Sequence, residues 1–446
     1  MSLIPSPTQV LVWFDLTASG NDQGPFGLLG EDLDALLLED GSTIDLENDV
    51  GDGLGFFTLD DSVSGLLDSD YVLAGDIAQD ITSHVQSITL NRGRSAQILG
   101  DIPAGRWTVR LHNQDGTFDP FNPDSPYAGN LVPGKRVQVL TDDVVIAEGF
   151  IEDWDLFWSL NGKADAQFDC TDALAALAGI TLDDWSPTSQ LSGARIGAIL
   201  DRPEVAWNAG RDIDTGAVTL QADTVTAGTN ALNYAQLVAR TEGGKLYATR
   251  LGDIRFQDRA ATLAEPGPVA FRDDGTGVPY RRIQVTYGSE QLFNVIELER
   301  VGGTLQTAID TTSVDRYRRR TFTASGLLHN TDEAALDSAN WLLTYYSSPV
   351  IRFSTITVDL ADPRIDAATR ANIVGLDIGD AVTIEFQPSP TATPIERWAA
   401  IEGVDHVIET DRHTVTLHLG YTIESGTFLL LDDDVFGLLD SNVLGF

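Results

Sequence analysis

The chain has 446 residues, and its 28 basic and 67 acidic residues give a formal net charge of −39. This charge argues against binding to nucleic acid, because such binding depends on Lys and Arg side chains that neutralise phosphates. One cysteine, Cys170, excludes an intrachain disulfide framework and a zinc site built from cysteines. The length and an apolar content of 42% predict several domains, and no apolar run is long enough to predict a membrane-spanning segment.

An acidic, leucine-rich segment occupies residues 1–79 and contains no Lys or Arg. Its segment 59–69 recurs without a gap at 431–441, within the C-terminal segment 426–446. Apolar residues occupy matching positions in both copies, and repeats of this kind need a partner that covers their apolar face. We expect both copies to dock on neighbouring subunits; an acidic tail that docks on nothing is the alternative. The docking residues predicted in this way are Leu59, Asp60, Asp61, Val63, Gly65, Leu66, Leu67, Asp68, Leu431, Asp432, Asp433, Val435, Gly437, Leu438, Leu439 and Asp440.

Residues 80–185 are expected to form a first β domain. Between 106 and 112, apolar and polar residues alternate with the period of a strand that buries one face. Further strands are predicted at 132–140, 144–151 and 164–170. A short helix from Thr171 to Ala178, ended by Gly179, is predicted to follow the last of them.

The segment from Arg92 to Trp154 carries a dense sequence motif, including HNQDGTFDPFNPDSPYAGNLVPGKRVQV and GFIEDW. This motif resembles the minor tail or tail-hub proteins of long-tailed, siphovirus-type phages. Segments 229–240, 252–256 and 376–382 resemble the same proteins in the same order, so the resemblance covers roughly residues 71–425. The residues that carry the motif are Arg92, Gly93, Arg94, Asn113, Asp115, Gly116, Phe118, Pro120, Pro126, Tyr127 and Gly134.

The resemblance implies a structural protein of the virion that is made in the host cytoplasm and located at the tail tip. Such a hub joins the tail tube to the host-contacting tip and surrounds the path by which the genome leaves. The implied partners are two further copies in a homotrimer, the tail tube or distal tail ring protein, the tape-measure protein and other tail-tip proteins. The resembling segments carry no catalytic residue, so we expect no enzyme activity and no cofactor. The net charge argues against sequence-specific binding of DNA. Carboxylates that face the channel would let a polyanion pass without sticking.

Residues 186–275 are expected to form a small α+β domain. A helix is predicted over 194–200, and Asn230 is predicted to cap a second helix that stops at Gly243. Residues 245–257 have the pattern of a hairpin.

Residues 276–425 are expected to form a second β domain. Strands are predicted at 282–287, 293–300, 352–360, 381–386, 398–408 and 413–423. A helix from Asp332 to Tyr346 is predicted to begin at a cap formed by Asn330. The predicted fold class is therefore mainly β with α+β insertions: two tube-like β-barrel or sandwich domains, a small α+β domain between them, and acidic terminal segments for interaction.

Two sequence patterns resemble functional sites, a phosphate-binding loop and a metal site, and each has a simpler structural interpretation. Residues 129–135 match the start of a phosphate-binding loop, but they lack the Ser or Thr that holds magnesium, and a strand is expected next. His406, His413 and His418 lie close in sequence, but the last two should point to opposite faces of a strand. We therefore expect no metal site, and we expect Cys170 to be a small buried residue.

Trp154, Phe157 and Trp158 form an aromatic group at the end of the motif. We expect these side chains to close the core of the first β domain. The alternative is a surface patch, which would suit a peripheral tail-tip protein that binds a host receptor or a cell-wall sugar. A tail-associated hydrolase is a third possibility, but carboxylates are too abundant in this sequence to identify a catalytic pair.

Overall fold

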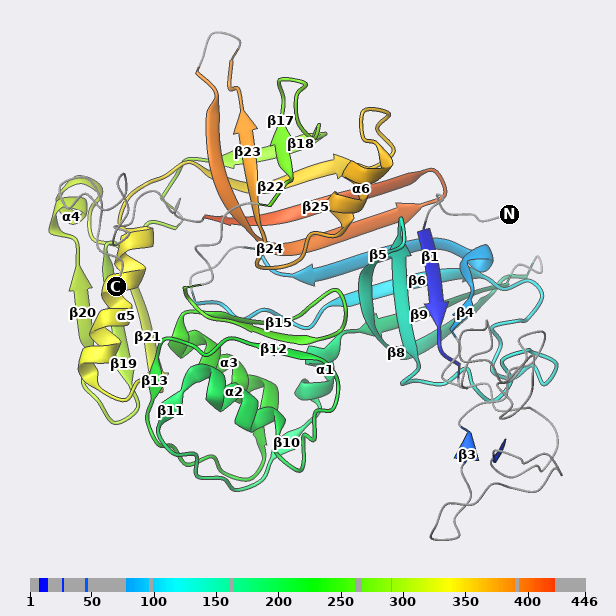
Figure 1. Ribbon diagram of the computed structural model, residues 1–446, viewed down its shortest axis with the longest axis horizontal. Helices are drawn as coiled ribbons and strands as arrows, with labels where there is room; N and C mark the ends of the chain where they lie inside the picture. Colours follow the sequence, from blue (N-terminus) through cyan, green and yellow to red (C-terminus); the bar gives the residue numbers. More distant parts are fainter. Residues whose placement is uncertain are drawn as a thin grey trace, which may run out of the picture.

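The computed structural model describes residues 8–14, 78–95, 99–160, 164–260, 267–289, 291–389 and 393–421, and the backbone of two short paired strands, β2 (Phe26–Gly27) and β3 (Asp45–Leu46). Thirteen strands form one large sheet, and two α+β units lie beside it (Figure 1). This mainly β architecture with α+β insertions confirms the predicted fold class. Among the described residues, no helix is both long enough and apolar enough to cross a membrane.

The first half of the large sheet contains five antiparallel strands in the order β5-β6-β9-β8-β7. Beyond β7 the sheet continues with β1 (Thr8–Val12) and then β4 (Gln79–Asp80), which leads into the short helix η1 (Thr82–His84). The bounds of the five strands are β5 (Val85–Gly93), β6 (Arg106–His112), β7 (Arg136–Thr141), β8 (Val144–Trp158) and β9 (Ala164–Thr171).

The second half repeats this strand order, as β18-β22-β25-β24-β23. When the five strands of each half are counted along the chain, the first to the fifth strand of one half therefore lie in the same spatial order as those of the other. A further strand, β17 (Ala270–Arg272), pairs with β23. The bounds are β18 (Arg282–Thr286), β22 (Arg352–Asp359), β23 (Ala381–Phe386), β24 (Ile395–Glu409) and β25 (Arg412–Tyr421).

The two halves agree in detail at the start of the third strand. Gly134 and Gly379 both have positive φ, at 88° and 91°, a conformation that favours glycine. The Gly134 amide donates to Ile151 O at 2.7 Å, and the Gly379 amide donates to Ile401 O at 2.8 Å. The long strands β8 and β24 have 15 residues each, and each has an irregularity directly after its isoleucine. The sheet is therefore an internal repeat.

A single apolar core lies under both halves of the sheet and includes Trp107, Val109, Ile356 and Leu417. Side chains that alternate with these core residues form a polar face. One row of this face follows the register across seven strands, from β22 to β8. Its members are Asp359, Thr414, Val407, Thr89, Thr108, Asp169 and Asp153, none of which is fully buried.

The first α+β unit lies below the sheet in Figure 1. Its helices are α1 (Ala173–Ala178), α2 (Ser192–Leu200) and α3 (Ala231–Glu242). Asn230 caps α3 by accepting from Asn233 N at 3.0 Å, as predicted, and Gly243 ends it with φ of 76°. The predicted helix start at Thr171 is wrong, because Asp172 is the cap and accepts from Leu174 N.

The strands of this unit are short except for the predicted hairpin, which is confirmed. Strands β15 (Lys245–Ala248) and β16 (Ile254–Gln257) pair antiparallel, and β12 (Arg211–Ile213) joins β16 in parallel. The other strands form two small sheets, with bounds β10 (Thr181–Leu182), β14 (Thr229–Asn230), β11 (Gln190–Leu191) and β13 (Thr219–Leu220).

A second α+β unit interrupts the second half of the sheet between β18 and β22. Helix α5 (Asp332–Tyr346) packs on a sheet of three strands and has the predicted bounds. Its predicted cap, Asn330, is wrong, because the Thr331 side chain accepts from Ala334 N at 3.1 Å. The remaining elements are β19 (Val295–Arg300), β20 (Gln306–Ile309), β21 (Thr321–Leu327), α4 (Thr311–Tyr317) and, before β23, α6 (Ala367–Val374).

Candidate functional site

The two halves of the sheet meet where β5 pairs antiparallel with β24, and we call this contact the seam. Six pairs define it, from Gly403 opposite Gly93 to Ile408 opposite Ile88. Gly93 has φ of 86°, and a Cβ at this position would lie 2.3 Å from Glu402 O. Only glycine therefore fits here, because the two strands approach too closely for any side chain.

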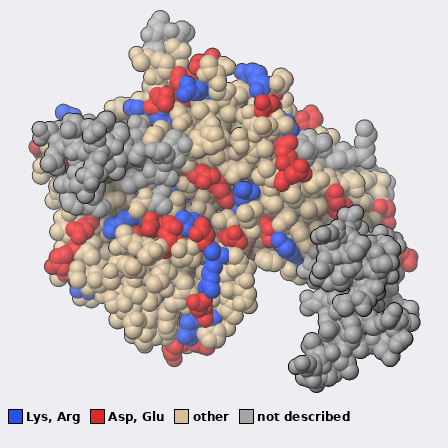
Figure 2. All heavy atoms as spheres, viewed as in Figure 1, with Lys and Arg blue, Asp and Glu red and all other residues tan. Residues whose placement is uncertain are grey.

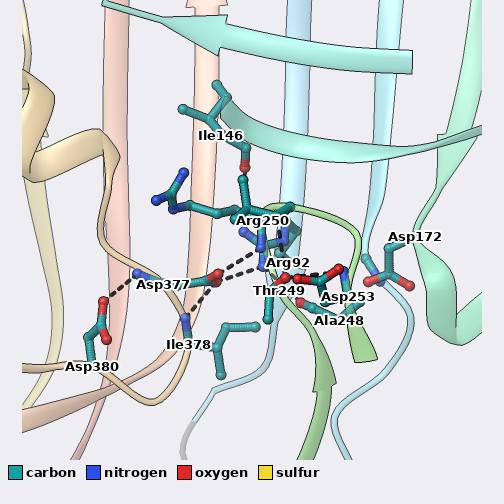
Figure 3. A network of polar contacts seen from close by, with 12 residues as sticks. Arg92, Ile146, Asp172, Ala248, Thr249, Arg250, Asp253, Asp377, Ile378 and Asp380 are labelled. Atoms are coloured by element: carbon teal, nitrogen blue, oxygen red, sulfur yellow. Dashed lines mark hydrogen bonds and ion pairs between the residues drawn. The ribbon is translucent and has the colours of Figure 1, made fainter. Parts of the chain in front are cut away.

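Arg92, the residue before this glycine, holds three parts of the chain together (Figure 3). Its buried guanidinium donates to Ala248 O of the first α+β unit at 2.8 Å and to Ile146 O of β8 at 3.4 Å. It also forms a 2.6 Å ion pair with Asp377, which belongs to the second half of the sheet. The planar guanidinium, with its five N–H groups, suits this junction better than a lysine would.

Asp377 is itself fixed by several donors. The backbone N–H of Arg250 donates to one carboxylate oxygen at 2.7 Å, and the N–H of Ile378 donates to the other at 2.8 Å. Nearby, burial raises the pKa of Asp172 to about 6, although the N–H of Gly105 and the charge of Arg92 act to lower it. The network joins three parts of the chain through largely buried contacts, which is a structural role.

A second buried ion cluster lies at the same seam. Glu402 accepts from Lys245 at 2.8 Å and from Arg94 at 3.1 Å, and all three side chains are nearly buried. Burial would raise the pKa of Glu402, but the charges of Lys245 and Arg94 outweigh it and lower the pKa. Figure 2 shows charged side chains of both signs along the boundary where the first α+β unit meets the sheet. The seam therefore depends on polar contacts as well as on strand pairing.

Two solved structures share this arrangement of strands and helices. The 43 kDa tail protein of prophage MuSo2 from Shewanella oneidensis has 12% sequence identity and a TM-score of 0.51, over 78% of this chain and 94% of that one. A tail protein from Neisseria meningitidis MC58 has 14% identity and a TM-score of 0.53, over 77% and 94%. The sequence matches no protein-family model and no curated protein.

This chain has a phage tail-protein fold. The predicted resemblance is thereby confirmed at the level of architecture. Within the tail-protein fold, the motif residues divide between two places. Arg92, Gly93 and Arg94 lie at the seam, and the others lie in or directly after the long turn between β6 and β7.

The long turn of the tail-protein fold is held by its own polar side chains. Asn113 accepts from Phe118 N at 2.8 Å, and Asp115 accepts from Thr117 N at 3.2 Å, next to Gly116 with φ of 73°. Phe118 is buried and stacks on Tyr127 with ring centroids 5.6 Å apart. Pro120 and Pro126 lie in the same turn. These residues fix the loop on the core, which is an architectural role.

The aromatic group divides in a way that the sequence did not predict. Trp154 packs on the core beside Phe118 and Phe168, as expected. The same expectation is wrong for Phe157 and Trp158, whose side chains are 47% and 63% exposed. Phe157 alternates with the core-facing Leu156 and therefore lies on the polar face, and Trp158 lies at the end of the strand, where no described part of the chain buries it.

The histidines form pairs in place of a metal centre. His406 and His413 are buried, and their ring nitrogens lie 2.9 Å apart, whereas His418 contacts Asp405 at 2.7 Å on the polar face. His413 and His418 thus point to opposite faces, as predicted. Burial holds the pKa of His406 well below its usual range and lowers that of His413 to about 4. No three potential ligands cluster within the described ranges.

Several important residues were not identified from the sequence. Asp377, Lys245 and Glu402 complete the seam, and their role depends on pairing between distant segments. Two signals were present: Asp377 lies within the recognised segment 376–382, and Lys245 is one of only three lysines in the chain. The predicted docking residues at 59–68 and 431–440 lie outside the described residues.

Proposed function

We propose that this chain is a structural tail protein, the hub or minor tail protein that joins the tail tube to the tip. The internal repeat carries this proposal. Two β halves with one strand order, joined edge to edge at the seam, make each chain two equivalent segments of a ring. Three copies would then supply six equivalent segments around the path of the genome.

The polar face of the sheet fits the lining of that path. Thr89 and Asn91 are exposed at its centre, and Asp153, Asp169 and Asp405 add carboxylates on either side. A mainly polar, partly acidic surface offers DNA little to bind. The face therefore supports passage of a genome without sequence-specific contact.

The remaining parts of the chain complete the proposal. We assign 80–185 and 276–425 to the two tube-like β domains and 186–275 to the α+β domain, with β1 and β17 added to the large sheet, α1 and β10 packed in the α+β domain, and the second α+β unit inserted in the second β domain. The rest of 1–79 and the segment 426–446 would dock on neighbouring tail proteins. The partners would include the tube or distal ring protein and the tape-measure protein. The chain would act mechanically at the tail tip of the virion, without catalysis or a cofactor.

The exposed Phe157 and Trp158 favour one other function, a peripheral protein that binds a receptor or a cell-wall sugar. Aromatic side chains suit sugar rings as well as proteins, so a glycan array with the purified chain separates the two functions. Specific sugar binding that is lost in a Trp158→Ala variant would favour the peripheral protein.

The copy number in purified particles tests the hub directly. Quantitative mass spectrometry measures it, with the tube protein as internal standard. Three copies per particle are expected for the hub. Six or more would favour a peripheral role, and absence from the particle would remove the structural function altogether.

A further inference from the structure

The internal repeat shows which edge of the sheet is left open. Strand β24 is paired along both sides: β25 lies on one side, and on the other β23 pairs with its first part and β5 with Gly403–Ile408. Its counterpart β8 has β9 on one side and β7 along Val144–Phe150 on the other. Within the described residues, no strand pairs with the β7 side of Asp153–Trp158.

A matching open edge lies at the other end of the repeat. Strand β18 occupies the place in the second half that β5 has in the first, and the sequences align from Ile88–Gly93 to Ile283–Gly288. β5 pairs with β6 and β24, whereas β18 pairs with β22 alone in the part of the chain that the structure describes. Within the described residues, each chain thus has one vacant position for a strand of the β5 type, beside β8, and one strand of that type, β18, with one edge open.

Burial agrees with an open edge at β8 and at β18 among the described residues. At the seam, the residues whose side chains face the core are fully buried: Ile88, Leu90, Val404 and His406. Their counterparts at the open edges touch the same core but stay half-buried: Ile283, Val285, Trp154 and Leu156. Tyr287, the counterpart of buried Arg92, is 70% exposed. A paired strand would bury these side chains, at about 25 cal/mol for each Å² of apolar surface.

We propose that β18 of one copy pairs antiparallel with Asp153–Trp158 of a second copy, in the register of the seam. This register places Thr286 opposite Asp155 and Gln284 opposite Phe157. No like charges face each other in this register, because the β8 edge carries Glu152, Asp153 and Asp155 without a basic residue, whereas β18 carries Arg282 and no acidic residue. In the proposed hub, the contact repeated around three copies would close the ring, so the proposal rests on the proposed hub and names its subunit interface.

Cysteine cross-linking between two full-length variants tests the register. Opposite Cα atoms in antiparallel strands lie about 4.5–5.5 Å apart, within the range of a disulfide. The chain Asp155→Cys is mixed with the chain Thr286→Cys and oxidised. Because Cys170 is buried, it stays unreacted in both variants. We expect a disulfide-linked pair of chains in the mixture and not in either variant alone.

The matched control replaces Thr286→Cys with Arg282→Cys, four residues along the same strand and about 13 Å away from the predicted partner. A disulfide that forms equally well in this control, or none in the test mixture at any chain concentration, would overturn the interface. Particle composition separates this failure from failure of the hub: a chain present in three copies per particle that does not form the disulfide remains a hub with a different interface.

Discussion

Arg92 and Asp377 lie 285 positions apart in sequence, yet their side chains meet at 2.6 Å beneath the seam. The contact links the first half of the sheet to the second, and the bond from Arg92 to Ala248 adds the first α+β unit. Arg92 can make both contacts only when the two halves of the sheet and the first α+β unit are folded against one another. The effect of replacing Arg92 on stability therefore tests whether these three parts fold cooperatively.

Replacing Arg92 with methionine should destabilise the chain strongly. The variant keeps most of the side-chain volume but leaves the partly buried Asp377 without its cation and two carbonyl groups without their donor, which costs up to about 3–5 kcal/mol in the free energy of unfolding. Denaturant unfolding measures the change. The control is Arg110→Met, whose ion pair with Asp165 is largely exposed and should contribute at most about 1 kcal/mol. Equal effects of the two variants would contradict the structural role of Arg92.

Gly93→Ala tests the close approach of the strands at the seam. An alanine at a positive φ costs roughly 1–2 kcal/mol by itself. At Gly134, where a Cβ would meet no atom within 4 Å, only this cost is expected. At Gly93 the clash with Glu402 O adds to it, so a loss of about 3 kcal/mol or more in unfolding free energy is expected. Similar losses of stability in Gly93→Ala and Gly134→Ala would show that the two strands at the seam leave room for a side chain at position 93.

The buried histidine pair predicts loss of stability in acid. Burial lowers the pKa of His413 to about 4, so between pH 6.5 and 4 the unfolded chain takes up a proton that the folded chain refuses. Stability therefore falls as pH falls through this window. In the variant His413→Gln, the slope of unfolding free energy against pH should decrease in this window, by at most the amount that corresponds to the uptake of one proton on unfolding.

His418→Gln is the opposite control. The hydrogen bond to Asp405 raises the pKa of His418, so protonation of this residue favours the folded chain, and its contribution is lost as pH rises through the raised pKa. Removing it should abolish this contribution between pH 6.5 and the raised pKa, and should leave the slope in acid unchanged, because there His418 is protonated in the folded and the unfolded chain alike. Parallel pH profiles for the two histidine variants would contradict both assignments.

Positive charge on the polar face should slow the ejection of the genome from the particle. Thr89→Lys combined with Asn91→Lys places two cations at the centre of the face without breaking any contact in the core. If this face lines the channel, DNA ejection from particles becomes slower, and added salt relieves the effect because it screens phosphate binding. Thr89→Gln with Asn91→Gln is the neutral control. Unchanged ejection kinetics in the lysine variant would place the face outside the channel.

Local features were predictable because their signals are local. Asn230 and Gly243 mark the two ends of α3, and both were identified from residue type alone. The cap of α5 was missed by one residue because Asn330 and Thr331 are both good caps, and only the structure shows which side chain reaches an amide. Such errors of one or two positions follow from chemistry that neighbouring residues share.

The seam was not predictable in the same way. The pairing of Thr89 with Val407 depends on tertiary packing across more than three hundred residues, and alternation within each strand carries no information about its partner. Phe157 and Trp158 were placed in the core because aromatic residues are usually buried, but they lie at an open edge of the sheet. Two tube-like β domains were expected from the sequence, but their shared strand order and their joining edge to edge, which explain the open edge, came only from the structure.

A three-dimensional reconstruction of the tail tip by electron cryo-microscopy tests the proposed hub most directly. We predict three copies of this chain in a ring around the channel, with Thr89 and Asn91 on the inner face and β18 of each copy beside β8 of the next. A chain found on the periphery of the tip, or one with this polar face turned away from the channel, would contradict the proposed function.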